Sequence, residues 1–258
     1  MFNYLFLAIL IIIPYGNAKN SFSVAPTKVE VDLSKPRTES FVVSNSGDDP
    51  IRVEASIIYF PVDSKDLNNG IALNPETSKL DSLEKNIIVS PRLVSLGVRE
   101  QRVIRISVRP PADMKTGEYR AHILFQMLEL SETQKKSIEN AAGKKVGMNL
   151  SFKLEMAASV IGLNGIPDPK IKGKCQLINN KIILEALNPS VWRFDGWIQL
   201  VSEGGKILRE EKNFVIRESQ RNFTFVDDEL KNHKKIKARF FLTKDGKAPL
   251  EVAECVSP

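Results

Sequence analysis

Apolar and polar residues alternate with a period of two along nearly the whole chain, whereas long runs with the 3.6-residue period of a helix are nearly absent. Clear examples lie at residues 51–59, 104–108 and 146–156. Side chains of an extended strand point alternately to opposite faces, so each run predicts a strand with one buried face. Turn-forming sequences such as Asn68-Asn-Gly70 and Pro110-Pro111 separate the runs. The sequence therefore predicts an all-β protein built from sandwiches.

The length of 258 residues suits one large or two ordinary domains. Hydrophobic residues make up 42% of the chain and charged residues 26%, which allows buried cores and excludes a disordered chain. The stretch GLNGIPDP at residues 162–169 concentrates glycine and proline, which predicts a linker. We expect an N-terminal domain at 19–161 and a C-terminal β-sandwich at 170–258. Expected C-terminal strands lie near 181–187, 196–201, 213–216, 222–226 and 237–242, and the polar stretch 131–142 is expected to be a loop with a frayed helical turn.

The first 18 residues, MFNYLFLAILIIIPYGNA, have the pattern of a secretory signal peptide. An apolar core at 5–13 is followed by Pro14 and by small residues at Gly16 and Ala18. The alternative is a membrane anchor, but the apolar core is short for one and Lys19 follows at once. We therefore expect removal of residues 1–18, no stable membrane insertion, and export to a compartment where disulfides persist.

Cys175 and Cys255 are the only two cysteines. An even pair in an exported protein predicts a disulfide, here joining the start of the C-terminal domain to its end. Two free thiols are the alternative, which is less expected outside the cytoplasm.

The sequence offers little that points to catalysis. It contains no G-x-S-x-G elbow, Walker loop or H-E-x-x-H motif, and two histidines with two cysteines are too few for most metal sites. His122 lies in an expected strand and is interpreted as structural, and His233 lies in a basic run at 231–237. That run could contact nucleic acid electrostatically, but an exported protein meets little of it. We predict a protein that is not an enzyme and has no cofactor, metal or nucleic-acid partner.

Three segments in order resemble a known family: VSPRLVSL at 89–96, EQRVIRI at 100–106 and GEYRAHILF at 117–125. Together with residues 41–53, they resemble the first domain of the periplasmic chaperones of the chaperone–usher pilus pathway. The resemblance covers roughly residues 24–161, and beyond them it is one of length and strand pattern. It implies two immunoglobulin-like sandwiches set at an angle with a cleft between them. It also implies a periplasmic, ATP-independent chaperone that lends a strand to pilus subunits and delivers them to an outer-membrane usher.

The donor strand of such a chaperone matches residues 144–156. Four apolar side chains there share one face, and polar residues occupy the other. The alternative is an ordinary sandwich strand, but the polar stretch before it favours a projecting edge. The expected donors are Val146, Met148, Leu150 and Phe152, and for Phe152 a place in the domain's own core is the alternative.

Two basic residues in the family's cleft bind the C-terminal carboxylate of the subunit, and by resemblance these are Lys28 and Lys153. Lysine keeps the charge of the family's usual first arginine but lacks its bidentate geometry. Where many members carry an interdomain arginine after the donor strand, this chain has Ala157-Ala-Ser-Val-Ile-Gly162, so another contact must hold the domain angle.

A different class of function stays open at this point. A structural or adhesive surface protein could be built from the same kind of domains.

The chaperone interpretation places the protein in fimbria biogenesis and cell wall organization. An exposed donor edge also makes self-association of the free protein plausible.

Overall fold

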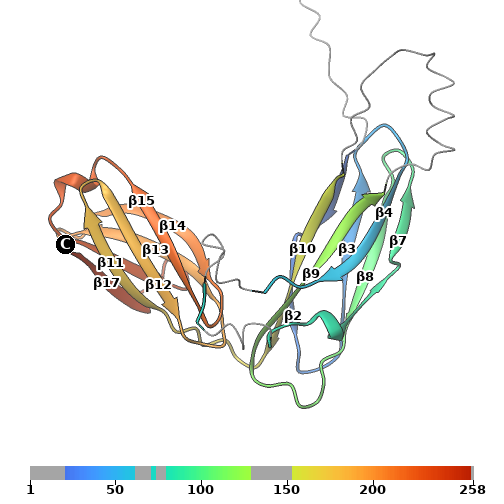
Figure 1. Ribbon diagram of the computed structural model, residues 1–258, viewed down its shortest axis with the longest axis horizontal. Helices are drawn as coiled ribbons and strands as arrows, with labels where there is room; N and C mark the ends of the chain where they lie inside the picture. The colour runs from blue at the N-terminus through green and yellow to red at the C-terminus, as the bar shows by residue number, and fades with distance from the viewer. Residues whose placement is uncertain (1–20, 62–70, 74–79, 129–152, 257–258) are drawn as a thin grey trace, which may run out of the picture.

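The computed structural model describes residues 21–61, 71–73, 80–128 and 153–256 of the 258-residue chain. These residues form strands and two short 3-10 turns, η1 (Glu84–Asn86) and η2 (Leu230–Asn232), with no α-helix among them. The strands gather into two lobes that form the arms of a V (Figure 1). The predicted all-β fold class is confirmed.

The first lobe is a sandwich of two sheets. Its four-stranded sheet has the order β1 (Phe22–Ala25), β3 (Arg37–Asn45), β8 (Gln101–Val108) and β6 (Ile87–Ser90). Its five-stranded sheet has the order β2 (Lys28–Asp32), β10 (Glu155–Asn164), β9 (Gly117–Leu128), β4 (Ile51–Ile58) and β7 (Leu93–Leu96). Only the β2–β10 pair in these two sheets is parallel.

The alternation predicted from the sequence creates the core of this first lobe. In β4, buried and exposed residues alternate strictly from Ile51 to Ala55. Phe41 of β3 and Phe125 of β9 meet edge to face across the sandwich, with ring centroids 5.6 Å apart. Such a pair adds stabilisation beyond the area that it buries, and here it joins the two sheets.

The second lobe is built on one continuous sheet rather than on two separate sheets. Its own strands follow the order β14 (Ile207–Val215), β13 (Phe194–Ser202), β16 (Ile236–Phe241), β17 (Glu251–Val256), β11 (Lys172–Ile178), β12 (Lys181–Asn188) and β15 (Ser219–Val226). The sheet curls over so that β14 comes close to both β12 and β15. The five strands expected here overlap β12 to β16, whereas β11 and β17 were not predicted.

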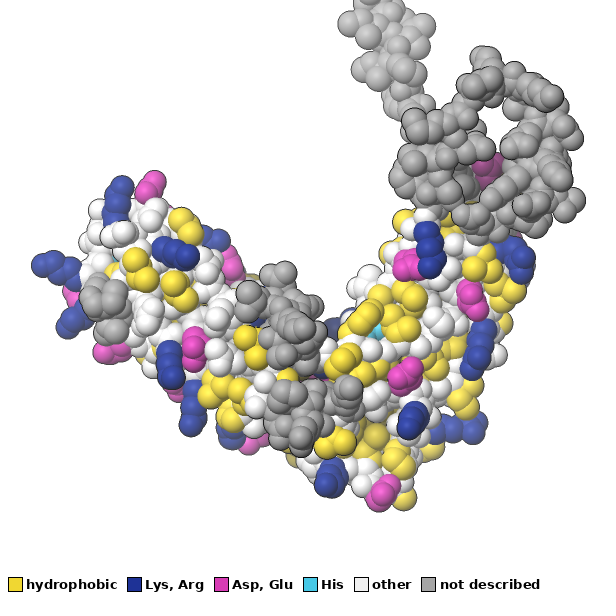
Figure 2. Space-filling view, viewed as in Figure 1, with side chains coloured by type: hydrophobic (Ala, Val, Ile, Leu, Met, Phe, Trp, Pro, Cys, Tyr) yellow, Lys and Arg dark blue, Asp and Glu magenta, His cyan; other side chains and the backbone are white. Residues whose placement is uncertain are grey.

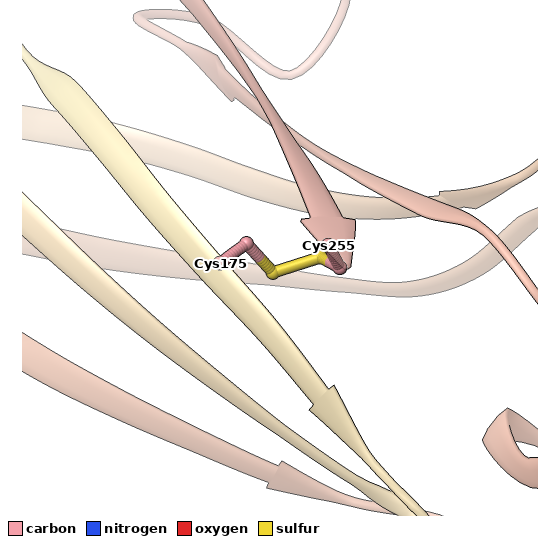
Figure 3. The surroundings of a disulfide bond; sticks show 2 residues. All are labelled: Cys175 and Cys255. Carbon is pink, nitrogen blue, oxygen red and sulfur yellow. A yellow bond between two sulfur atoms is a disulfide. The ribbon is translucent and has the colours of Figure 1, made fainter. Parts of the chain in front are cut away.

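The predicted disulfide is present in the structure and lies inside the second lobe (Figure 3). Cys175 of β11 and Cys255 of β17 are direct partners in this parallel strand pair, with Cα atoms 4.3 Å apart. Both residues are buried, so the bond is shielded from solvent.

The connection between the lobes starts later than the sequence indicated. β10 continues to Asn164 and β11 starts at Lys172, so the first three residues of the predicted linker, 162–164, are strand residues. Gly162 lies in this part of β10, where a side chain would collide with Leu33 and Leu83 of the first core.

Several expectations concern residues outside the described part of the chain. They include the signal peptide at 1–18, the polar stretch 131–142 and most of the expected donor strand. In the described residues, no helix has the length and apolar character needed to cross a membrane.

Candidate functional site

The start of β10 has one open edge. β9 pairs with β10 along its whole length, from Glu155 to Asn164, but β2 pairs with it only from Ser159 onward. β1, which precedes β2, comes near β10 but pairs with β3 of the opposite sheet. Among the described residues, no strand therefore pairs with the second edge of residues 155–158, and an unpaired edge can accept another strand.

The four expected donors, Val146, Met148, Leu150 and Phe152, lie outside the described residues. The described chain resumes just after them. Leu154 and Met156 pack, partly buried, against the first core. Chain continuity therefore puts the alternating residues 146–152 directly upstream of the open edge.

Lys28, the first expected anchor, lies where the two lobes meet. Its Nζ is 3.0 Å from Glu30 Oε1 on the same strand and 3.6 Å from Asp195 Oδ2 on β13 of the second lobe. The side chain is still 44% exposed. Burial alone would raise the pKa of Glu30, but the hydrogen bond and charge of Lys28, together with Arg193, hold that pKa below its ordinary value.

Lys153, the second expected anchor, lies apart from Lys28. Its Nζ is 2.6 Å from Glu155 Oε1, and its side chain is 62% exposed. In the β2–β10 pair, Lys28 faces Ser159, which is six residues beyond Lys153. At about 3.3 Å per residue, six residues of extended strand span roughly 20 Å. The structure does not bring these two lysines together.

Arg193 is the basic residue that does lie beside Lys28. Its Nη2 is 2.7 Å from Glu30 Oε1 and 3.5 Å from Asp195 Oδ2, the same two oxygen atoms that Lys28 approaches. Its side chain is only 16% exposed. Sequence reasoning missed this residue because its partner Glu30 is far away in the chain and Arg193 belongs to no recognisable motif.

Comparisons with known proteins agree with this architecture. No protein-family model matches the chain, and no curated protein matches it in sequence. The solved Escherichia coli chaperone DraB aligns over 93% of this chain and 97% of its own, with 16% identity and a TM-score of 0.50. The YadV chaperone aligns over 85% of this chain and 91% of its own, with 10% identity and a TM-score of 0.50.

The chain has the two-domain fold of the periplasmic pilus chaperones. The fold that the sequence resemblance implied, with two immunoglobulin-like domains at an angle, is thus confirmed. Figure 2 shows the open space between the two lobes, with apolar side chains visible on the part of the first lobe that borders it.

In this chaperone fold, Glu118 at the start of β9 is a junction between the lobes. Its backbone N–H donates to Val191 O at 2.9 Å, and its backbone oxygen accepts a hydrogen bond from Arg217 Nη1 at 2.8 Å. Its carboxylate lies 3.7 Å from Arg193 Nε. Three residues of the second lobe therefore contact three separate polar groups of one residue in the first.

The glycine before this junction makes the close approach feasible. Gly117 has a φ of +149°, and a side chain there would meet Val191 and Arg217 at 3.3 Å. A residue with a Cβ would be strained at this φ, and Val191 and Arg217 would have to shift by a few tenths of an ångström. Arg193 and Arg217 of the second lobe therefore make interdomain contacts that the sequence left unassigned.

Proposed function

We propose that the protein is a periplasmic, ATP-independent chaperone that binds pilus subunits by donor-strand complementation and passes them to an outer-membrane usher. The observation that carries this proposal is the open edge of β10 at residues 155–158, directly downstream of alternating apolar residues. The chaperone fold and the expected signal peptide support it.

Strand addition explains why such an edge would be retained. The edge supplies main-chain hydrogen bonds to an incoming strand, and alternate side chains fill pockets of the partner. A long apolar edge otherwise promotes aggregation, so it is a cost unless a partner covers it. A pilus subunit that lacks a strand of its own sandwich is the partner class that fits.

The proposed anchors take different roles because of their separation. Lys28 borders the second lobe and is proposed to bind the C-terminal carboxylate of the subunit, which would compete with Glu30 and Asp195 for its charge. Lys153 lies too far along the strand direction to bind the same carboxylate. We propose that it contacts the subunit nearer the donor residues.

The proposed division of the chain follows the strand boundaries. Residues 1–18 form the signal peptide, the first domain runs to the end of β10, and the second domain begins near Lys170. The usher contact and the periplasmic location follow from the proposed pathway.

The test is a pull-down of the mature protein from a periplasmic extract, with mass spectrometry of what co-purifies. A small secreted β-rich protein is expected in stoichiometric amount. Leu150→Asp should abolish its capture, because a carboxylate cannot enter an apolar groove without a large desolvation cost. Asn149→Asp is the matched control, since it adds the same charge on the opposite face and should retain capture.

Unchanged capture by Leu150→Asp would reject the donor assignment. If the Lys28→Ala, Lys153→Ala double variant binds the subunit with normal affinity, the anchor roles are rejected, and the donor-strand assignment is unaffected. If nothing is captured and the chain is found in sheared surface fibres, the structural or adhesive function replaces the chaperone proposal.

A further inference from the structure

The curled sheet of the second lobe brings two strand edges close to each other. β14 is the last strand on its side of the sheet and pairs only with β13. On the other side, β5 (Ile71–Ala72) covers only the first two residues of β15, Ser219 and Gln220. Since β14 comes close to β15, a seam lies between β14 and residues 221–226 of β15 (Figure 1). In the part of the chain that the structure describes, no strand fills this seam.

An arginine of β15 crosses the seam to β14. Arg221 Nη1 donates a hydrogen bond to Phe214 O at 2.9 Å, which uses a backbone acceptor of the edge strand. The Arg221 Cζ atom lies 4.6 Å from the centroid of the Phe214 ring and 4.9 Å from that of the Phe223 ring. The guanidinium therefore contacts an aromatic ring of each strand at distances that allow cation–π attraction.

A second arginine crosses the seam in the opposite direction. Arg209 of β14 places its guanidinium 5.6 Å from the ring centroid of Phe225 on β15. Its Nε also donates to Glu211 Oε1 on its own strand at 2.7 Å. Arg209 and Phe214 lie near opposite ends of β14, so side chains join the seam at two separate points.

The edge of β14 differs in its side chains from the open edge of β10. Between the two contacts, β14 carries the charged run REEK at 209–212, and such charges discourage pairing with another chain. Residues 155–158 of β10 read EMAA, with one charge followed by a methionine and two alanines. The edge of β14 therefore has protecting features that the edge of β10 lacks.

We propose that Arg221 and Arg209 hold the seam closed and so protect the edge of β14 from pairing with a second copy of this chain. An uncovered edge presents N–H and C=O groups that another strand can bind. The same edge of a second copy is the partner that fits, because two identical edges can pair antiparallel about a two-fold axis. This inference goes beyond the proposed function, since it concerns the second lobe of the free protein and needs no captured subunit.

The experiment compares the self-association of variants of the mature protein by sedimentation velocity over a range of concentrations. Arg221→Ala removes the hydrogen bond to Phe214 O and both ring contacts, so self-association should become about tenfold tighter than with the natural sequence. Arg239→Ala is the matched control, because it removes the same charge from β16, an inner strand of the same sheet. The control should leave self-association unchanged.

A cysteine introduced at Lys212, an exposed residue of β14, shows whether the association uses this edge. Both natural cysteines are in the disulfide, so a short bis-maleimide crosslinker reacts only with the introduced thiol. More crosslinked dimer is expected in the Arg221→Ala background than with the natural Arg221. A cysteine at Lys174 on β11, an inner strand, should give the same yield in both backgrounds.

Near-ultraviolet circular dichroism confirms that each variant is folded. If Arg221→Ala does not fold, Arg209→Ala decides in the same two assays, because it breaks the other contact and its side chain is 39% exposed. A folded variant that associates no more than the natural protein would overturn the proposal. Tighter association without more crosslinking at residue 212 would also overturn it, because another surface would then be responsible. Subunit capture is measured separately by pull-down, so either result leaves the proposed function untouched.

Discussion

Burial and ion pairing shift the pKa of the Glu118 carboxyl group in opposite directions. Burial raises its pKa, and the nearby Arg193 guanidinium lowers it. Burial dominates, so the pKa of Glu118 lies above its ordinary value of 4.5. In the pH range just above 4.5, the folded protein therefore keeps a proton on this group that the unfolded chain has lost.

This difference predicts an unusual pH dependence for Glu118→Gln. A group that binds protons more tightly in the folded state contributes stability that is lost as the pH rises through its folded pKa. The variant lacks that titration, so it should gain stability relative to the natural protein as the pH is raised from 4 toward neutrality. Urea denaturation of both proteins at a series of pH values measures the difference.

A difference of the opposite sign would mean that the ion pair with Arg193 outweighs the burial of Glu118. Glu54→Gln, an exposed change in the same sheet, serves as the control. It should show no comparable trend.

At the scale of elements, the missing side chain of Gly162 allows β10 to pack against the core of the first lobe at this position. An added Cβ would lie 2.6 Å from Leu33 Cδ1 and 2.8 Å from Leu83 Cδ1. Sequence reasoning assigned this glycine to a linker because glycine usually weakens strands. In the structure, its lack of a side chain lets the core of the first lobe close over β10.

Gly162→Ala should therefore destabilise the protein by about 1–3 kcal/mol, the range expected for overpacking a core. Gly204→Ala is the control, since no atom lies within 4 Å of its added Cβ. Urea unfolding followed by far-ultraviolet circular dichroism compares the two. Equal stability of both variants would show that the leucines move aside at little cost.

The elements that sequence could predict are those with a long enough pattern. Residues 51–59 and 104–108 alternate clearly, and the structure places 51–58 in β4 and 104–108 in β8. β5 (Ile71–Ala72), which pairs with β15 of the second lobe, has two residues, too few for any period, and β15 is far away in the chain. Strand pairing of this kind depends on tertiary contacts that local patterns do not encode.

The same limit applies to the site. Lys28 could be named as a candidate anchor because it sits in a segment that resembles a family motif, and its role stays a prediction. Arg193 could not, because its importance arises only when β13 meets β2. The six-residue offset of Lys153 from the partner of Lys28 also needed the strand register, which one sequence does not supply.

At the scale of the whole molecule, the Cys175–Cys255 disulfide closes the second lobe across a sequence separation of 80 residues. A crosslink over a loop of this size restricts the unfolded chain strongly. The double variant Cys175→Ala, Cys255→Ala should lose about 2–5 kcal/mol of stability in this lobe.

Both tryptophans of the chain, Trp192 and Trp197, belong to the second lobe, so their fluorescence during urea unfolding follows this lobe. Hydrogen exchange of strands β3 and β8 should change little, because they lie in the other lobe. An unfolding midpoint unaffected by the double variant would mean that the strand pair β11–β17 holds without its crosslink.

The placement of β17 has a consequence for the order in which a growing or exported chain can assemble. β17 lies inside its sheet, between β16 and β11, although it comes after every other described strand in the sequence. β5, made much earlier, has to wait for β15 before it gains a partner. The first lobe has all its strands once residue 164 has emerged, whereas the second lobe and the link between them are completed only near the end. The complete two-lobed fold therefore forms only after nearly the whole chain has been delivered. Products truncated before β17 should lack an inner strand of the second lobe.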